Sequence, residues 1–580
     1  MRARGQAARS WRPLRVGSAL LLVVIVLGLE SATAVAAMSP ETAGASPAPP
    51  ATTPVPSDLP ERPDDYEISA VEALRIADTD PLVGAERERA GALRATVEAE
   101  AVRLWEVGYF ADGSKEVLIV VDGVTGEIVE SWNEDQVLWP MARGREGQFG
   151  HVLNSPWVWI PMALVFLMGL VDWRRPRKIV HLDLLVLLSF GLSHIFFNRA
   201  EIGVSVALYY PPLAYLLARM LWIGFRGVGR GTGISPSAPT AALVVACVLL
   251  AGFRVGMNVF DSGVIDVGYA GVVGADKIAD ADAIYGEGAF PENNPTGDTY
   301  GPANYFAYVP FEQVFPWSGS WDALPAARAA AIGFDLLSLA GLALLGWRLS
   351  GRRLAAIFAF AWLAYPYTAF VLQSNANDSL VAALLIWSLV AFAEPLARGA
   401  LLAAAALTKF APLALAPLYL AGERGLLSWR PERRYLRPVL LYGGGFVVAA
   451  MLFLAHPAIE PGLATFWDRT IGSQGARESP FSLWGQTGVE LPHTIAKAAV
   501  VALALTVALV PRERSFAQIA ALGAAVVIAM QVVLEHWFYL YIVWFLPLLL
   551  VAIIWRQSEP GEGEGEGSPA SPNAPLHSRR

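Results

Sequence analysis

Long apolar runs separated by short polar segments recur along most of the chain. A run of about 20 apolar residues is long enough to cross a hydrocarbon core of roughly 30 Å as a helix. The pattern predicts twelve such helices, at about 16–37, 153–172, 180–197, 202–225, 238–257, 326–348, 354–373, 379–395, 438–456, 493–510, 516–534 and 537–555. It therefore predicts an all-α polytopic membrane protein.

The placement of arginine and lysine sets the expected orientation in the membrane. Five arginines lie within residues 2–15, before the first run, so the positive-inside rule keeps the N-terminus in the cytoplasm. Later basic clusters fall on the same side at 174–178, 226–230, 348–353 and 512–514, and at Arg556. The first run ends in Ala34-Val35-Ala36-Ala37, so residues 1–37 are either a membrane anchor or a signal peptide cleaved nearby. In both cases we expect a multi-pass protein of the cell membrane whose next segment lies outside.

One apolar segment, residues 399–420, does not fit the rule that the basic clusters lie on the cytoplasmic side. If it crossed the membrane, the five arginines between 424 and 437 would all lie outside. A re-entrant hairpin of two short helices would keep these arginines in the cytoplasm. A bend is expected there because Pro412 breaks a helix and disfavours helix at Ala411. Irregular backbone at membrane depth is tolerated where it is buried in protein or lines a polar cavity. We therefore expect a cavity at the bend, around Thr408 to Pro412.

Composition supports a membrane protein and removes several other classes. Hydrophobic residues make up 55% and charged residues 16%, and the mean hydropathy is +0.44. A net charge of −8 and a pI near 5.5 exclude the basic surface that binding to nucleic acid needs. The single cysteine, Cys247, excludes a disulfide framework and a cysteine-based metal site.

Three longer segments, at 38–152, 258–325 and 457–492, are expected on the outer side. The Pro/Ala/Ser/Thr-rich residues 38–63 predict a disordered linker, and 557–580 a disordered cytoplasmic tail. The rest divides into a small α+β domain at 64–140, N-terminal transmembrane helices at 153–237, and a second membrane domain at 238–556 that contains the 258–325 loop.

The pattern of the small outer domain changes from helical to strand-like along its length. We expect helices at Ser69–Asp78 and Glu86–Arg103, followed by a β-meander of Leu104–Phe110, Lys115–Asp122 and Glu127–Trp132. The stretch Val120-Val-Asp-Gly-Val-Thr-Gly-Glu-Ile-Val129 resembles the signature of PepSY-type domains. The resemblance covers about 70 residues and implies a small helix-plus-sheet module outside the membrane. The plainer alternative is an α+β cap over the membrane part.

The 258–325 segment carries the strongest candidate chemistry. It holds ten acidic residues against one basic residue, Lys277, and most of these acids are simply solvated. Asp261 and Asp266 differ because they follow a membrane helix directly. Burial of a carboxyl beside an apolar wall raises its pKa and suits it to act as a base. The interleaved Tyr and Trp residues could stack on sugar rings, although aromatic residues are common at any membrane interface.

Several motifs in this part of the chain resemble those of a known enzyme class. Asp266-Val-Gly-Tyr269 directly after a membrane helix resembles the first outer loop of the C-type membrane glycosyltransferases. Tyr285-Gly286 and Tyr300-Gly301-Pro302 resemble the family 87 polyprenol-phosphate-mannose-dependent mannosyltransferases. Further similarity lies in Gln373-Ser-Asn-Ala-Asn-Asp378, Ala406-Leu-Thr-Lys409 and Arg477-Glu-Ser-Pro-Phe-Ser482. The resemblance covers roughly 240–555, and the chain departs from it in its PepSY-like domain and the helices before the acidic loop.

The resemblance implies roles for particular residues. Asp266 would be the catalytic base, with Asp261 as the alternative, and Tyr269, Tyr300, Asn377 and Asp378 would contact substrate. Apart from the resemblance, His536 near the outer end of a helix is the best candidate for a second polar group that contacts acceptor or phosphate. A polyprenyl-phosphate donor leaves a phosphate monoester, so cations must stabilise its charge. The few basic residues expected on the outer side are Arg199, Lys277, Lys409, Arg469, Arg477 and Lys497.

Lys409 and Arg477 are the candidates for the donor phosphate. Lys409 could instead snorkel to the interface, and Arg477 could pair with Glu478 or Asp468. His536 could be an ordinary residue at a helix end. We expect no cofactor and no dedicated metal site, although Asp261 and Asp266 could hold a divalent cation with the donor phosphate.

The leading hypothesis is therefore an integral-membrane glycosyltransferase. It would transfer a hexose, mannose first, from a polyprenyl-phosphate donor to a lipid-linked or cell-envelope acceptor, working among membrane lipids. The alternative is a multi-pass transporter or lipid-glycan flippase, since many helices, a broken hairpin and intramembrane charges suit that role as well. Transporters usually contain two matching repeats, which this sequence lacks. A third class, a signalling or assembly protein, would leave Asp266 and Lys409 dispensable.

Overall fold

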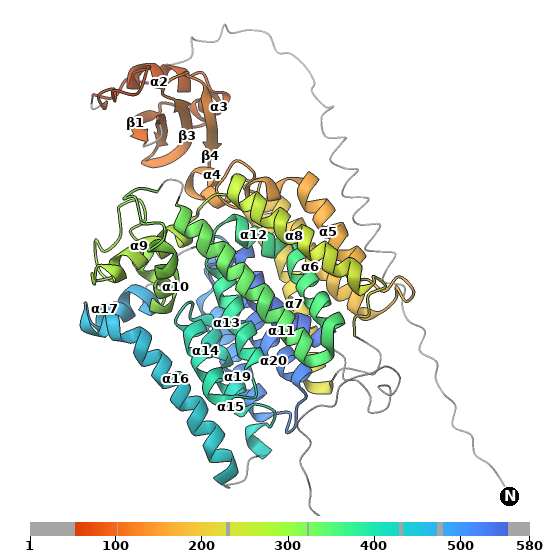
Figure 1. Ribbon diagram of the computed structural model, residues 1–580. Coiled ribbons are helices and arrows are strands. Elements are labelled where there is room, and N and C mark those ends of the chain that lie inside the picture. Colours follow the sequence, from red (N-terminus) through yellow and green to blue (C-terminus); the bar gives the residue numbers. More distant parts are fainter. Residues whose placement is uncertain are drawn as a thin grey trace, which may run out of the picture.

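The computed structural model describes residues 53–57, 59–100, 103–227, 233–321, 324–428, 433–472 and 479–554. It shows a large helical body with a small sheet-containing unit at one end (Figure 1). The first expected membrane helix at 16–37, most of the 38–63 linker, Arg477 and the 557–580 tail lie outside the described residues.

The small unit is a four-stranded antiparallel sheet covered by two helices. The helices are α2 (Ala70–Ala77) and α3 (Pro81–Ala90), and the strands, in the order β1-β2-β3-β4, are Arg94–Glu100, Leu104–Ala111, Ser114–Asp122 and Ile128–Asn133. Its core contains Ala73, Leu74, Trp105, Val107, Tyr109, Val117, Ile119 and Val121. Side chains alternate across the strands, so one face of the sheet can bury these residues against α2. The β-meander expected from the sequence is present.

The expected helix at Glu86–Arg103 is wrong in its second half. Helix α3 stops at Gly91, whose φ of +84° is unfavourable for other residues. Beyond it, Leu93, Ala95 and Val97 are buried while Arg94 and Glu98 are exposed, which is the period-two pattern of a strand. Residues Arg94–Glu100 pair along β2 as β1. The high charge of this segment concealed its alternation.

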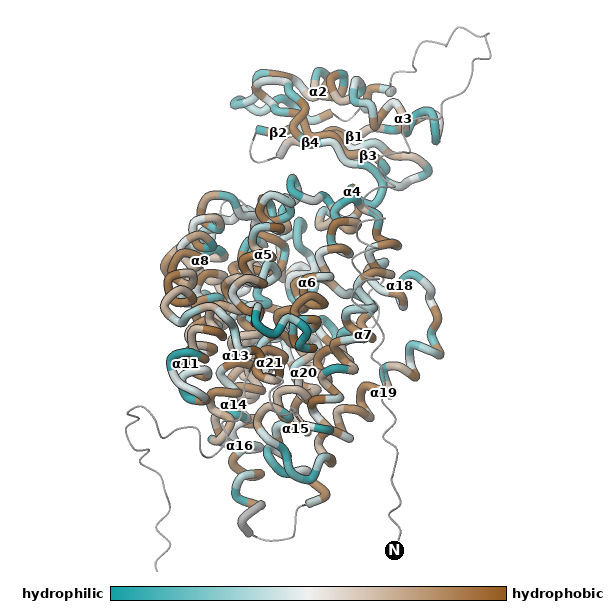
Figure 2. The backbone as a smooth tube through the Cα atoms, turned by 90° about the vertical axis from the view of Figure 1, so that its right-hand side faces the viewer, coloured by the Kyte–Doolittle hydropathy of each residue, from teal (hydrophilic) through white to brown (hydrophobic). Residues whose placement is uncertain are grey.

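The helical body is built from membrane-type helices. Six helices among the described residues are long and apolar enough to cross a membrane: Ile179–Phe197 (α6), Ile202–Arg226 (α7), Thr240–Phe260 (α8), Pro325–Ala364 (α11), Leu436–Ile459 within α16 (Arg433–Ile459) and Glu490–Leu509 (α19). Shorter apolar helices complete the body: α5 (Pro156–Leu170), α12 (Pro366–Gln373), α13 (Asp378–Val390), α14 (Pro395–Ala406), α15 (Ala416–Ala421), α20 (Phe516–Val532) and α21 (Ile542–Ile554). The chain is thus mostly helical. In Figure 2 the helices of this body are largely brown, the colour of hydrophobic residues.

Helix α11 consists of two antiparallel legs. The backbone leaves the helical conformation at Ser350 and Gly351, where φ of Gly351 is +76°. Beyond the turn the second leg packs back on the first, because a Cβ on Gly346 would lie 2.7 Å from Ala355 Cα. The two legs correspond to the expected runs 326–348 and 354–373, the second of which continues into α12 after a break at Tyr365.

Residues 395–421 have the shape of a hairpin. Helix α14 ends at Ala406, the chain turns, and it returns through the 3₁₀ turn Ala411–Leu415 (η4) and α15. The two ends lie close together, since a Cβ on Gly422 would be 3.6 Å from Nη1 of Arg398. The tip lies beside the start of α13, where Lys409 meets Asp378. This is the position at which Pro412 was expected to break the helix.

The acidic 258–325 segment contains two packed helices. These are α9 (Asp266–Ala279) and α10 (Pro302–Glu312), joined through the 3₁₀ turn Gly297–Thr299 (η3). A Cβ on Gly271 would lie 2.6 Å from the Tyr308 ring, and one on Gly274 would lie 2.2 Å from the Tyr305 ring. The spacing of three residues between glycines thus gives α9 a smooth face for the aromatic rings of α10. The later 457–492 segment forms α17 (Leu463–Trp467), the π-turn Asp468–Gly472 (η6) and α18 (Leu483–Thr487).

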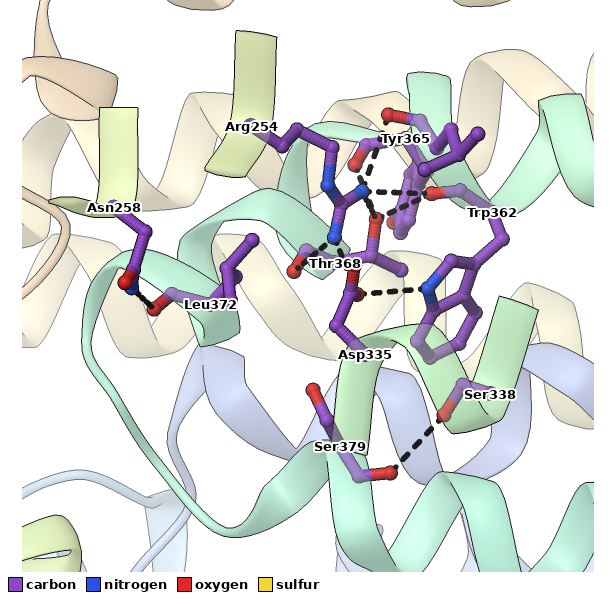
Figure 3. A network of polar contacts seen from close by, with 10 residues as sticks. Arg254, Asn258, Asp335, Ser338, Trp362, Tyr365, Thr368, Leu372 and Ser379 are labelled. Carbon is purple, nitrogen blue, oxygen red and sulfur yellow. Dashed lines mark hydrogen bonds and ion pairs between the residues drawn. The ribbon is translucent and has the colours of Figure 1, made fainter. Parts of the chain in front are cut away.

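A sealed ion pair ties three helices together deep in the body (Figure 3). Arg254 of α8 is 1% exposed, and its Nη2 lies 2.6 Å from Oδ1 of Asp335 of α11. The same guanidinium donates to the side chain and the carbonyl of Thr368 on α12. Trp362 also donates to Asp335, at 2.8 Å. The charge of Arg254 is thereby paired within the protein.

Candidate functional site

A cavity of about 460 Å³ lies among the hairpin tip, the start of α9 and the residues that follow α20. Four of the residues singled out from the sequence line it: Asp266, Tyr300, Lys409 and His536. Most of the remaining lining is apolar or aromatic, and it includes Met141, Phe149, Phe538, Tyr541 and Trp544. A concave apolar site with a few convergent polar groups is the usual form of a small-molecule site.

Lys409 lies at the hairpin tip on the wall of the cavity and is 11% exposed. Its Nζ donates to Oδ1 of Asp378 at 2.7 Å. Three aromatic rings surround the ammonium, with centroids 5.3 Å away for Tyr541 and Trp544 and 5.7 Å for Tyr300. Cation–π contacts stabilise a charge in this way, and an ammonium has three donors, so Lys409 keeps donor capacity toward the cavity. The lysine is therefore paired by the protein, and its presence does not require a phosphate.

Asp378 and Asn377 do not line the cavity, although Asp378 contacts Lys409, which does. Both are fully buried at the start of α13. Asp378 accepts from Lys409 and, at 2.8 Å, from Nε1 of Trp544, whereas Asn377 donates to Asn304 of α10 at 2.7 Å. Asp378 can therefore act on a ligand through Lys409, which it holds in place.

Asp266 faces the cavity from the first residue of α9, and the residue is exposed. The expectation that Asp261 and Asp266 are buried beside an apolar wall is therefore wrong, because both residues are exposed at the turn between α8 and α9. Its carbonyl accepts from Nδ2 of Asn294 at 3.0 Å, which fixes the turn before the helix. The N-terminus of a helix carries partial positive charge and stabilises a carboxylate. An accessible carboxylate can accept a proton from a substrate hydroxyl.

Asp261 and Tyr269 do not line the cavity. Asp261 lies 3.5 Å from Nδ1 of His151 and accepts from the backbone N–H of Val152 at 3.3 Å. Tyr269 is 1% exposed and stacks on Trp321 with ring centroids 4.5 Å apart.

His536 lines the cavity next to residues 479–482, the described part of the Arg477–Ser482 motif. Its Nδ1 lies 3.0 Å from Oγ of Ser479, and its ring lies 5.3 Å from that of Phe481. The sequence placed His536 in the site on chemical grounds alone, and the structure brings it to the same cavity as Lys409.

The cavity also holds charged residues to which the sequence analysis assigned no role. Lys497 of α19 and Glu535 line it, with Nζ 3.3 Å from Oε1, and His493 approaches the same carboxylate at 3.4 Å. The position of Glu535 directly before His536 was the signal that could have found it.

A further ion pair holds the neighbouring loops together. Arg469 of η6 donates to Asp298 of η3 through Nε at 2.5 Å and Nη2 at 2.9 Å. The hydrogen bond to Asp298 raises the pKa of Arg469 above its usual value. Thr299 and Ile471, one and two residues away, both line the cavity.

The charged and polar groups of the cavity include the carboxylates of Asp266 and Glu535, the ammonium groups of Lys409 and Lys497 and the imidazole of His536, beside aromatic rings. Among the residues that the structure describes, no three His, Cys, Asp or Glu side chains gather closely enough to hold a metal ion. The arrangement suits a ligand with a hydroxyl for Asp266 and an anionic group for Lys409. No profile of a known protein family, no curated protein and no solved structure matches the chain.

Proposed function

We propose that the protein is an integral-membrane glycosyltransferase. It transfers a hexose, mannose in the first instance, from a polyprenyl-phosphate donor to a lipid-linked or cell-envelope acceptor on the outer side of the cell membrane. The observation that carries the proposal is the shared cavity, in which Asp266 and Lys409 face one space lined by Tyr300, Tyr541 and Trp544. Aromatic rings of this kind give a sugar a surface on which to stack.

The proposed reaction needs one base and one cation. The acceptor hydroxyl oxygen attacks the anomeric carbon while Asp266 takes its proton. The bond between the anomeric carbon and the phosphate oxygen breaks, and polyprenyl phosphate leaves with the electron pair and inversion at carbon. Lys409 stabilises the developing charge on the phosphate, and a preorganised contact of this kind contributes about 2–4 kcal/mol.

Asp266→Asn tests the base directly. The amide is nearly isosteric but cannot accept the proton, so turnover of polyprenyl-phosphate-mannose by purified protein should fall by about 10²-fold to 10⁴-fold with donor binding retained. Asp280→Asn, the same change at the exposed far end of α9, is the matched control. Near-normal turnover in Asp266→Asn together with an inactive Asp261→Asn would move the role to Asp261. Full activity in both variants and in the double variant would exclude the mechanism.

The same proposal places the helices in the membrane as about twelve spans plus a re-entrant hairpin at 399–420. Both ends of the hairpin then lie on the cytoplasmic side, together with residues 423–437. The bridge between Arg424 and Glu513 is consistent with this arrangement, since 512–514 is one of the basic turns expected inside. A cysteine at Ser428 should not react with an impermeant reagent added to intact cells. Labelling from outside would rule the hairpin out.

A further inference from the structure

The segment between the sheet and α5 forms part of the cavity wall. We call residues 134–155 the connector; it contains α4 (Asp135–Leu138) and the 3₁₀ turns Pro140–Ala142 (η1) and His151–Asn154 (η2). Two of its side chains, Met141 and Phe149, line the cavity. The connector lies between the small unit and the helical body (Figure 2). It also contributes side chains to the cavity wall.

The connector contacts the helical body through aromatic rings and is braced internally by side-chain hydrogen bonds. Trp139 packs edge-on against Phe481 at 4.8 Å, and Phe149 packs against Phe538 at 5.4 Å between ring centroids. Nδ2 of Asn154 donates to the carbonyls of Gly144 at 2.9 Å and of Phe149 at 2.7 Å. Met141 and Phe149 thus belong to a wall of defined shape.

The connector also touches the chain just before Asp266. A Cβ on Gly263 would lie 2.4 Å from the carbonyl oxygen of Gln148, so only glycine permits this approach. Asp261 holds the next turn of the connector through His151 and the N–H of Val152. The wall that contains Phe149 consequently adjoins the cavity at the Asp266 side.

We propose that Met141 and Phe149 determine acceptor specificity and that Asp261 is a positioning residue for this wall. The inference rests on the proposed function, in which the acceptor hydroxyl must reach Asp266. The acceptor then presents this hydroxyl to Asp266 and an apolar face to Met141 and Phe149, as a pyranose ring does. The small sheet unit acts on the reaction through the connector that it anchors.

Alanine variants separate acceptor binding from the rest of the reaction. With an alkyl mannoside as acceptor, Met141→Ala and Phe149→Ala should each raise the acceptor KM roughly tenfold or more, because an apolar pocket discriminates by about this much per missing group. The donor KM should not change, and Met141→Leu should restore most of the acceptor binding. Leu138→Ala is the control, since Leu138 is 62% exposed on the same connector and does not line the cavity. An unchanged acceptor KM in both alanine variants would overturn the inference.

Asp261→Ala provides a different readout from Asp266→Asn. Loss of the positioning contact should raise the acceptor KM by several-fold with kcat nearly kept, whereas loss of the base lowers kcat. Equal losses of kcat in the two variants would remove Asp261 from the positioning role.

Cysteine labelling tests the wall without turnover. In a Cys247→Ala background, the thiol of Met141→Cys should be protected by the alkyl mannoside and not by polyprenyl-phosphate-mannose alone. Protection by the donor alone, or by neither, would overturn the inference. If the wild-type protein transfers no sugar while the acceptor still protects this thiol, the proposed function fails and the acceptor site remains.

Discussion

Two buried ion pairs in the same helical body differ in what surrounds them. Arg254–Asp335 and Lys409–Asp378 have similar distances, 2.6 and 2.7 Å, and a nearly or fully buried carboxylate in each case. Arg254 is 1% exposed and lines no part of the cavity described above, whereas Lys409 is 11% exposed and lies on its wall. The distance within a pair therefore does not reveal its role.

The partners of the two cations reveal the difference. The terminal nitrogens of Arg254 donate to five acceptors, which lie on Trp362, Leu363, Thr368 and Asp335. Lys409 has one hydrogen-bond acceptor among the described residues, Asp378, and otherwise faces aromatic rings. Arg254 is built to join α8, α11 and α12, while Lys409 is held in place with donors to spare. The first pair should govern stability and the second should govern ligand binding.

The largest effect is expected at the fully buried Arg254–Asp335 pair. Arg254→Ala leaves the Asp335 carboxylate buried without its cation, which typically costs about 3–5 kcal/mol. We expect the variant to be recovered poorly from membranes and to unfold at a clearly lower temperature in detergent. The double variant Arg254→Met with Asp335→Leu removes both charges at similar volume and should recover most of the stability. A normal melting temperature in the single variant would contradict the assignment.

The Lys409–Asp378 pair at the cavity wall should show the opposite behaviour. Lys409→Met with Asp378→Asn removes both charges, so the fold should persist while donor use falls roughly 30-fold to 1000-fold, the loss of about 2–4 kcal/mol of preorganised charge stabilisation. Turnover at limiting polyprenyl-phosphate-mannose and the melting temperature are the two measurements. Lys277→Met, on α9 and outside the cavity lining, is the matched control.

The single variant Lys409→Ala has a less direct meaning. It leaves Asp378 buried without its cation, so part of any loss could come from the fold. Unchanged donor dependence in the double variant would assign Lys409 to structure alone and would make the two pairs alike.

The sequence predicted the elements whose signal is local. The membrane-type helices follow from their apolar runs, the β-meander from its alternation, and the bend of the hairpin from Pro412. The break within α11 falls between two expected runs because Gly351 and the nearby arginines interrupt the apolar pattern. The expected helix beyond Gly91 failed, since charged residues on one face of β1 concealed the alternation of Leu93, Ala95 and Val97.

The candidate site was predicted in part, because its residues are brought together by tertiary contacts. Asp266, Tyr300, Lys409 and His536 were chosen from motifs and chemistry, and they meet at one cavity. The sequence could not show that Asp378 lies under Lys409, since 31 residues separate them. It also could not show that Asp261 faces His151, which is more than a hundred residues away.

The smallest effect is expected at a third pair, which tests whether the exposure of an ion pair determines how much it stabilises the fold. Lys497 and Glu535 also line the cavity, but their side chains are 53% and 29% exposed and their distance is 3.3 Å. Exposed pairs contribute about 0–1 kcal/mol and are screened by salt, so Lys497→Met should leave the melting temperature within a few degrees of the wild type at low and high salt. A loss as large as that of Arg254→Ala would mean that a cation at the cavity edge can stabilise the fold as strongly as one sealed within it. Exposure would then be the wrong criterion, and the role of Lys409 would have to be decided from ligand binding alone.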